Sequence, residues 1–214
     1  MSDIVETPAL VLKPRKRPKP GERRVQILQA LATMLEQPGA ERVTTAGLAA
    51  KLEVSEAALY RHFASKAQMY EGLIDFIETS VFSLINQIVA SDTNTADGLS
   101  SPQRQTERLV TMLVQFAEKN PGMTRVMVGD ALVFENDRLQ HRMSQFFDKI
   151  EATLRQCLRG AALATGSSQP TADAQISASV LTAFVVGRLQ RYARSGFKRL
   201  PSENLEACLA LIKV

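Results

Sequence analysis

The sequence predicts an all-α protein with a small N-terminal head on a larger helical body. Apolar residues recur at helical spacing along most of the chain, and no segment of useful length alternates apolar and polar residues as a strand does. The 214 residues, 45% of them hydrophobic and 22% charged, fit one globular protein of two parts. We expect a basic arm over residues 1–22, a head over 23–67 and a body over 68–214.

The arm is expected to be disordered, because several prolines interrupt any helix and the motif KPRKRPKP concentrates positive charge there. No apolar run approaches the ~18 residues that span a bilayer, and the N-terminus lacks the apolar core of a signal peptide. The basic stretch has no neighbouring amphipathic helix with bulky apolar residues, which a membrane-surface protein would use. We therefore expect a cytoplasmic protein that binds no membrane.

Three helices are predicted in the head, and a fourth leads out of it. The first begins at Glu22 and ends before Pro38, with apolar residues at positions i, i+1, i+4, i+7 and i+8. The motif TTAGLAAKL begins with threonines suited to cap a second helix, and Ser55 is suited to cap a short third one. Ser65 and Gln68 fit a reciprocal capping box at the start of the long fourth helix.

The body is predicted to be a bundle of longer helices. The clearest has an apolar face opposite five Lys and Arg residues, and the last two are expected to form most of a dimer interface. Gly187 costs about 1 kcal/mol of helix stability relative to Ala, so it either permits close approach of the second subunit or packs on the body's own core. The predicted helices cover residues 22–37, 44–52, 56–62, 66–90, 102–119, 121–134, 137–163, 172–195 and 202–213.

Positive charge is concentrated in the first third of the chain. Residues 13–66 carry eleven Lys or Arg and five Asp or Glu, whereas residues 67–214 carry fifteen of each sign. A basic portion on a neutral body is an electrostatic footprint for a polyanion such as nucleic acid, although a charged, solvated surface has the same composition.

The second and third predicted helices form a helix-turn-helix, a motif whose second helix enters the major groove of DNA. The alternative is an ordinary amphipathic helix pair with a polar outer face. Ser55 at the helix N-terminus and Lys66 suit phosphates. Tyr60 suits the DNA backbone or a thymine methyl group, and Arg61 suits a guanine edge or a phosphate. The predicted DNA-binding residues are Thr44, Thr45, Ser55, Glu56, Ala57, Tyr60, Arg61, His62 and Lys66.

The motif LAAKLEVSEAALYRHFASKAQMY resembles the head of the TetR family of bacterial regulators, with Tyr60, His62, Phe63 and Lys66 in register. Glu53 stands where that family usually has Gly, and a left-handed turn tolerates this residue at modest cost. The resemblance implies a three-helix DNA-binding head and a helical body that forms a twofold homodimer.

Two body segments, NPGMTRVMVGDALVFENDRLQHRMSQFFDKIEATLRQCLR and RLQRYARSGFKRLPS, resemble the nucleoid occlusion factors, a branch of the same family. That resemblance implies a nucleoid-associated dimer that binds palindromic chromosomal sites and, when bound, antagonises polymers of the cell-division GTPase FtsZ. It also implies a groove for the FtsZ tail beside the long fourth helix, where Leu84 and Gln115 depart from the family's pattern. The groove residues carried over to this chain are Phe76, Met112, Lys119 and Asn120.

Phe76 lies off the centre of the apolar face of its predicted helix, which suits a binding surface, although packing on a neighbouring helix would explain it equally well.

A ligand-responsive transcriptional repressor is the alternative function, because most TetR-like proteins sense a small molecule in the body. Eight Met and Phe residues could line such a pocket, but a stripe of this kind is more typical of plain core. A small-molecule ligand is therefore not expected, and ligand-dependent operator binding would support this alternative. The eight residues are Met112, Phe116, Met123, Met127, Phe134, Met143, Phe146 and Phe147.

An enzyme is not predicted. The glycines of the N-terminal third are scattered and form no phosphate-binding loop. His62 and His141 lack metal-ligand spacing with Cys or carboxylates. We expect no cofactor, no metal site and no catalytic residue, and we expect Cys157 and Cys208 to be small buried apolar residues.

Overall fold

The computed structural model describes residues 21–37, 43–91 and 102–212, so residues 1–20 of the predicted arm lie outside the described part of the chain. Within it, all regular structure is helical, which confirms the predicted fold class. The elements are α1 (Glu22–Leu35), α2 (Thr45–Lys51), α3 (Glu56–Tyr60), α4 (Lys66–Ser91), α5 (Pro102–Lys119), α6 (Pro121–Met127), the 3₁₀ turn η2 (Asp130–Leu132), α7 (Asp137–Ala164), α8 (Pro170–Arg194) and α9 (Leu205–Ile212).

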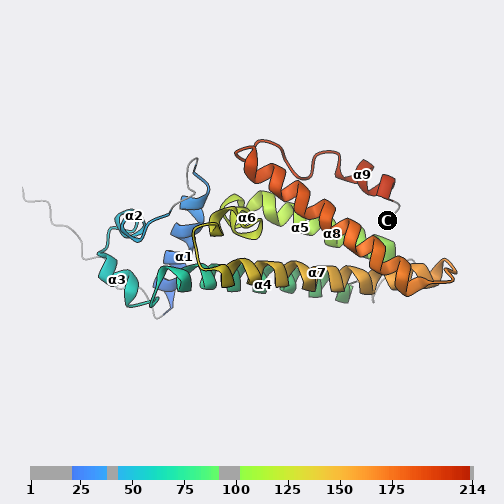
Figure 1. The fold of residues 1–214 in the computed structure, drawn as a ribbon, viewed down its shortest axis with the longest axis horizontal. Coiled ribbons are helices and arrows are strands. Elements are labelled where there is room, and N and C mark those ends of the chain that lie inside the picture. The colour runs from blue at the N-terminus through green and yellow to red at the C-terminus, as the bar shows by residue number, and fades with distance from the viewer. Residues whose placement is uncertain (1–20, 38–42, 92–101, 213–214) are drawn as a thin grey trace, which may run out of the picture.

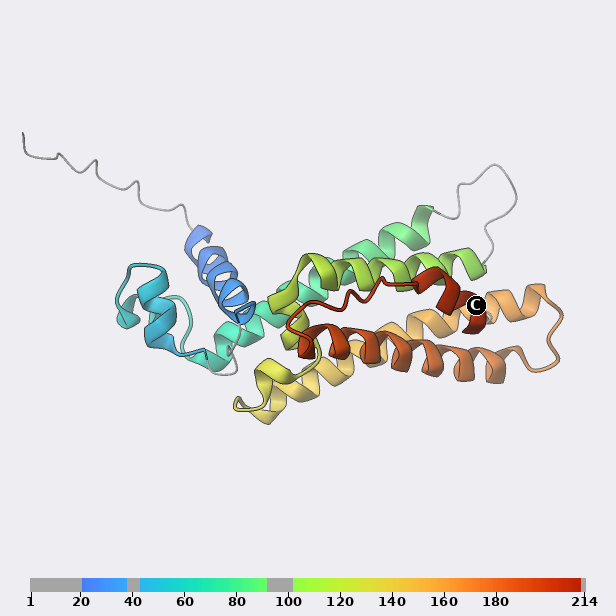
Figure 2. The ribbon, with the colours of Figure 1, turned by 90° about the horizontal axis from the view of Figure 1, so that it is seen from above.

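The helices α1–α3 form a head at one end of an elongated body, and α4 runs from the head along that body (Figures 1 and 2). The helices α7 and α8 form the most extensively packed pair, and α5 packs against α4, α7 and α8. The short α9 follows a long connection that leads back from the head-proximal end of α8 (Figure 2). The predicted boundary after residue 67 therefore falls inside the first turn of α4, a helix that head and body share.

One apolar core continues from the head into the body. On α4, residues at helical spacing turn one face inward, and Leu73, Ile77 and Val81 are fully buried. Burying each such side chain contributes about 1.5–3 kcal/mol, so this face is the main reason that α4 stays attached along its length.

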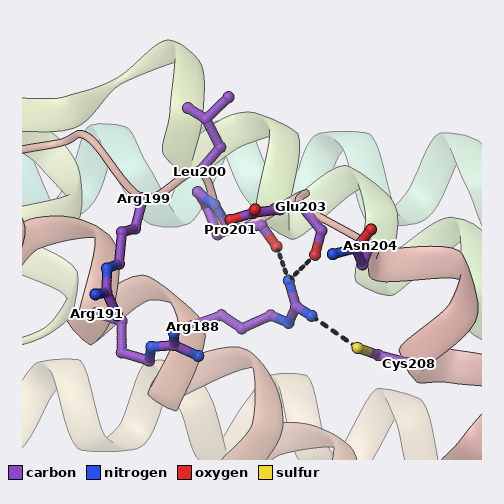
Figure 3. Close-up of a pocket in the computed structure, with 8 residues that line it drawn as sticks. All are labelled: Arg188, Arg191, Arg199, Leu200, Pro201, Glu203, Asn204 and Cys208. Atoms are coloured by element: carbon purple, nitrogen blue, oxygen red, sulfur yellow. Dashed lines mark hydrogen bonds between the residues drawn. The ribbon is translucent and has the colours of Figure 1, made fainter.

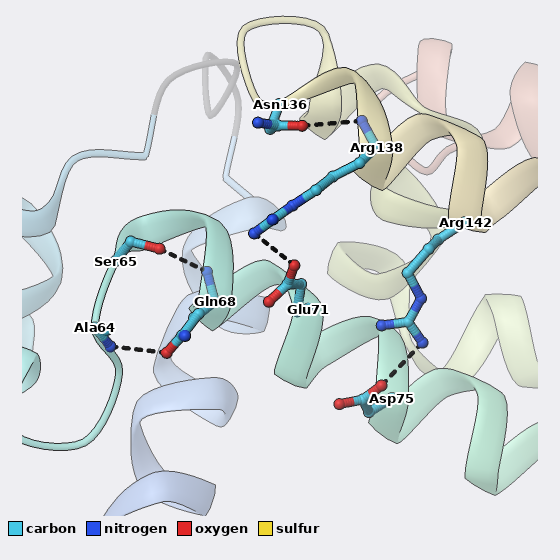
Figure 4. Close-up of polar contacts among 8 residues, drawn as sticks. All are labelled: Ala64, Ser65, Gln68, Glu71, Asp75, Asn136, Arg138 and Arg142. Carbon is cyan, nitrogen blue, oxygen red and sulfur yellow. Dashed lines mark hydrogen bonds and ion pairs between the residues drawn. The ribbon is translucent and has the colours of Figure 1, made fainter.

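The outer side of α4 is joined to α7 by ion pairs (Figure 4). Arg142 of α7 binds both Asp75, at 2.9 Å, and Glu78, at 2.7 Å, and Arg138 binds Glu71 at 2.7 Å. By length and composition alone α4 could span a bilayer, which corrects the expectation that no segment has this property. One face of α4 is buried and its acids pair with α7, so α4 packs on the bundle through this face while Phe76 and other residues of its outer side are exposed.

The start of α4 confirms the predicted cap. The Gln68 backbone N–H donates to Ser65 Oγ at 3.2 Å, and the Gln68 side-chain oxygen accepts from the backbone N–H of Ala64 at 2.8 Å (Figure 4). The side chain of Gln68 thus reaches one residue further back than the usual reciprocal arrangement.

The prediction of one helix over residues 121–134 was wrong. The helix α6 ends at Met127, and Gly129 adopts a left-handed conformation with φ 84° before η2 begins. Left-handed φ values are readily available only to glycine, so Gly129 marks the place where the helix stops. A single glycine within a helical pattern did not reveal this break beforehand.

The last helix also begins later than predicted. Residues before Leu205 form turns, and Asn204 has a φ of 52°. The guanidinium of Arg188 on α8 donates to the backbone oxygens of Pro201 and Glu203 at 2.6 and 2.8 Å, which satisfies these carbonyls without a helix.

The head is fixed on the body by a close contact between α1 and α6. A Cβ atom added to Gly122 would lie 1.9 Å from the backbone oxygen of Ala32, so only glycine fits there. Gly187, in contrast, has nothing within 4 Å of its added Cβ. The alternative that Gly187 packs against the body's own core is therefore wrong.

Candidate nucleic-acid interface

The turn between α2 and α3 has the geometry of a helix-turn-helix. Glu53 adopts a left-handed conformation with φ 54°, and the Val54 N–H donates to the Ala49 carbonyl at 3.0 Å to close the turn. This bond satisfies a carbonyl at the end of α2. A non-glycine residue in this conformation costs about 1–2 kcal/mol, and the packing of the two helices must offset that strain.

The packing behind the motif is apolar and nearly complete. Leu48, Leu59 and Phe63 are buried between α1, α2, α3 and the start of α4. On the outer side of this cluster, the Arg24 guanidinium lies 4.2 Å from the centre of the Phe63 ring and donates to the His62 backbone oxygen. These contacts fix the orientation of α3 relative to the rest of the head.

The polar side chains predicted to meet DNA lie on the outer surface of the motif. The side chain of Tyr60 is 45% exposed, which is unusual for a large aromatic residue and places it on the rim of α3. Ser55 is the N-cap residue of α3, and its side chain makes no capping bond, so its hydroxyl is free for a ligand. The exposed predicted residues are Thr44, Ser55, Glu56, Ala57, Tyr60 and Arg61, whereas Thr45, His62 and Lys66 are half-buried.

Two of the predicted residues bind each other. The Thr45 hydroxyl donates to the Glu56 carboxylate at 2.6 Å and joins the N-terminal turns of α2 and α3. Thr44 caps α2, since its hydroxyl accepts from the Gly47 N–H at 3.1 Å. Thr45 and Glu56 therefore belong to the same surface, but their mutual bond must break or be shared before either meets a base.

Lys66 is not free in this structure, contrary to what its position suggested. Its ammonium forms an ion pair with Glu135, a residue between η2 and α7, and the two side chains are only 31% and 11% exposed. Burial, followed by the charge of Glu135, raises the pKa of the neighbouring Tyr70, so its hydroxyl remains protonated. The start of α4 is thus tied electrostatically to the body.

Sequence reasoning missed the basic residues of α1 that face this surface. Arg23, Arg61 and His62 line a hollow of about 180 Å³ beside α3, and Arg24 stacks on Phe63 nearby. The pair of arginines at the start of α1 was the available signal, because adjacent cations beside a recognition helix suit a phosphate backbone.

The residues predicted to receive a protein tail lie on or near α4 and α5. Phe76 projects from α4 with 49% of its surface exposed, and Lys119 is exposed at the end of α5. Asn120 uses its side-chain amide to donate to the Phe116 carbonyl at 2.7 Å. Met112 lies two turns earlier on α5 and lines a groove of about 930 Å³ that Ile88 and residues of α9 also border.

In the described part of the chain, most of the Met and Phe residues of the alternative pocket are packed in or against the apolar core. Phe116, Met127, Met143 and Phe146 are buried in the core, and Phe134 is exposed. Of the eight, only Met112 borders one of the cavities described here. Cys157 is buried as predicted, whereas Cys208 is half-buried and accepts a hydrogen bond from Arg188.

Two protein-family models match the chain. Residues 27–73 match the model described as bacterial regulatory proteins, tetR family, and residues 103–213 match an SlmA-like model described as tetracyclin repressor-like, C-terminal domain. Curated relatives include the nucleoid occlusion factor SlmA of Vibrio cholerae, 50% identical over 192 residues that cover 89% of this chain and 93% of the relative. The nucleoid occlusion factor SlmA of Photobacterium profundum is 49% identical over 189 residues, which cover 88% and 92%.

Solved structures share the fold at much lower sequence identity. The fatty acid degradation regulator FadR of Bacillus halodurans has a TM-score of 0.71 at 14% identity, covering 91% of this chain and 96% of that one. The TetR family regulator PfmR of Thermus thermophilus has a TM-score of 0.68 at 20% identity, with 87% and 96% covered. These similarities establish the arrangement of a three-helix head on a helical body and nothing about ligands.

Proposed function

Because the chain belongs to the TetR family, in its SlmA-like group, we propose that it is a nucleoid occlusion factor rather than an enzyme or a ligand-responsive repressor. The observation that carries this proposal is identity of about 50% to curated SlmA proteins over about 90% of both chains. In this role it binds chromosomal DNA, and while bound it acts on the division machinery.

The DNA contact is assigned to α2, α3 and the start of α4. In the major groove, α3 would present Tyr60 and Arg61, and the hydroxyl groups of Thr44 and Ser55 would donate to phosphates. The support is their exposure on one face of the head and the basic residues of α1 beside them.

A twofold dimer would let two heads read a palindrome. The helix α8 exposes apolar side chains along one side, including Ile176, which is 65% exposed, and Val180. Gly187 lies two turns further along at helical spacing and has open space beside it. On α9, Leu205 and Leu209 are buried within the same chain, whereas Leu211 is 83% exposed, so we assign the dimer contact to α8 and α9 together.

The partner is proposed to be FtsZ, on the strength of the family resemblance. Its tail would lie along α4 and α5, which are antiparallel neighbours (Figure 2). Ile88 of α4 and Met112 of α5 border the same groove. Because the two helices are antiparallel, Phe76, which precedes Ile88 on α4, lies toward the end of α5 that carries Lys119 and Asn120. The exposed ring of Phe76 on α4 and the exposed cation of Lys119 at the end of α5 suit a peptide with apolar and acidic groups.

The direct test is sedimentation of FtsZ polymers with this protein, with and without a palindromic duplex. We expect fewer polymers only when protein and duplex are both present. A duplex of the same length and composition with a scrambled sequence is the control. Polymer levels that are unaffected by the DNA-bound protein would overturn the proposal, and operator release by a small molecule would favour the repressor instead.

A further inference from the structure

A hollow of about 260 Å³ lies between α8 and the connection to α9 (Figure 3). Three arginines, Arg188, Arg191 and Arg199, line it together with a single acid, Glu203. Its lining residues belong to α8, to α9 and to the connection between them, and these elements lie away from α3 (Figure 1). The residues are used by neither the proposed DNA contact nor the proposed FtsZ contact, and Arg191 lies one turn beyond Gly187, so the hollow borders the face of α8 that we assign to the dimer.

Arg188 forms the fixed floor of this hollow. One of its terminal nitrogens donates to the backbone oxygens of Pro201 and Glu203, and the other donates to Cys208 Sγ at 3.0 Å. The guanidinium also lies 4.6 Å from the centre of the Phe184 ring. A guanidinium carries five N–H donors, so two remain, and its neutral partners leave its charge uncompensated.

Arg191 and Arg199 approach the hollow from two different segments (Figure 3). Both are exposed, and in the described part of the chain neither side chain makes a hydrogen bond, an ion pair or a ring contact. Their placement brings like charges around one concave surface, which is unfavourable unless an anion joins them. Within the single chain, all five N–H donors of each guanidinium are therefore available to a ligand.

The connection that carries Arg199 is held firmly in place. The Arg199 backbone N–H donates to Ser195 Oγ at 2.9 Å, and the Ser202 N–H donates to the Glu118 carboxylate at 2.8 Å. Between these anchors, the Phe197 ring packs edge-on against Tyr192 at 5.2 Å. A ligand would therefore meet a backbone that is already ordered, which lowers the entropy cost of binding.

We propose that this hollow, which we call the arginine pocket, binds a phosphate group of a small phosphorylated molecule. The lining carries three positive charges and one negative charge, a balance of two. A phosphate group carries about −1.5 to −2 at pH 7 and offers three strong acceptor oxygens, whereas a carboxylate offers only a single charge. Guanidinium groups match phosphate with paired hydrogen bonds, so the charge and the donor geometry both favour phosphate.

The test is calorimetric titration of the full-length protein at constant ionic strength with pyrophosphate, inorganic phosphate and acetate. We expect pyrophosphate to bind more tightly than phosphate, and acetate not to bind. Arg191→Gln and Arg199→Gln should each weaken pyrophosphate binding at least ten-fold. Both side chains are free of contacts, so neither change should alter folding, which a thermal melt would check. Arg104→Gln removes the same charge from an exposed position on α5 and should have no effect.

A dinucleotide with one phosphodiester identifies the source of the phosphate. Because a phosphodiester carries only one negative charge, binding at least as tight as that of inorganic phosphate would assign the pocket to a nucleic-acid backbone, and weaker binding would assign it to a free phosphorylated molecule. The proposal is overturned if the wild-type protein binds no pyrophosphate, if acetate binds equally well, or if Arg104→Gln reduces binding as much as the pocket variants. None of these outcomes depends on FtsZ, so the proposed function is tested separately.

Discussion

Replacing Glu135 by Gln should tighten DNA binding and make it more sensitive to salt. In the structure Glu135 holds the Lys66 ammonium at the start of α4, so a DNA phosphate must compete with a carboxylate for it. Gln keeps the shape and one acceptor oxygen but removes the charge. Because Glu135 is only 11% exposed, losing the pair should cost more than the ~1 kcal/mol of an exposed ion pair, and a thermal melt should confirm that the variant remains folded.

The size of the effect follows from counterion release. Each additional Lys–phosphate contact steepens the slope of log K against log salt by about 0.9, so two copies of Lys66 in a dimer add about 1.8. If the wild-type Lys66 stays paired with Glu135 on DNA, raising salt from about 0.1 to about 0.3 M should therefore weaken the variant about seven-fold more than the wild type.

Fluorescence anisotropy of a labelled palindromic duplex, measured over a series of KCl concentrations, gives both the affinity and the slope. Asp137→Asn is the matched control, because it removes the same charge from an exposed residue nearby in the chain. Adding Lys66→Ala to the Glu135→Gln variant should abolish the gain. If Glu135→Gln and Asp137→Asn shift the slope equally, the effect comes from the change in net charge and not from the release of Lys66.

Three further substitutions test the remaining surfaces. Tyr60→Ala should weaken operator binding by about 1–3 kcal/mol in the same anisotropy assay, whereas Val25→Ala, an exposed apolar change on α1, should not; equal affinities would remove α3 from the groove. Phe76→Ala should leave DNA binding intact and reduce FtsZ contact in co-sedimentation, and loss of both activities would instead indicate misfolding. Gly122→Ala should destabilise the protein by at least about 1–3 kcal/mol and lower the melting temperature, because the new methyl group meets the Ala32 carbonyl; an unchanged melt would show that α1 and α6 separate readily.

Local chemistry made the head predictable from the sequence. The cap at Ser65 and the left-handed turn at Glu53 depend on residues close together in the chain, and both are present in the structure. The apolar period of α4 likewise identified its buried face, since the same residues are in the core. The presence of a helix and the direction of its apolar face depend on the spacing of apolar residues, which can be read directly from the sequence.

Contacts between distant segments were not predictable in the same way. Lys66 looked free for a phosphate because its partner Glu135 lies sixty-nine positions further along the chain. Gly122 gave no sign that a backbone oxygen would approach it, and Arg188 resembled an ordinary basic residue near a helix end. Each of these roles arises from a contact between segments that are far apart in the sequence. Helix propensity and hydrophobic periodicity describe only local sequence and do not predict such contacts.

The continuity of α4 has a mechanical consequence. With 26 residues it is about 39 Å long at 1.5 Å per residue, and no break separates the end beside the recognition helix from the end beside the α5–α9 groove. A stiff rod of that length converts a tilt of about 5° at one end into a displacement of roughly 3 Å at the other. A tilt imposed on the head end of α4 would therefore reach the end that carries Ile88, a residue that borders this groove.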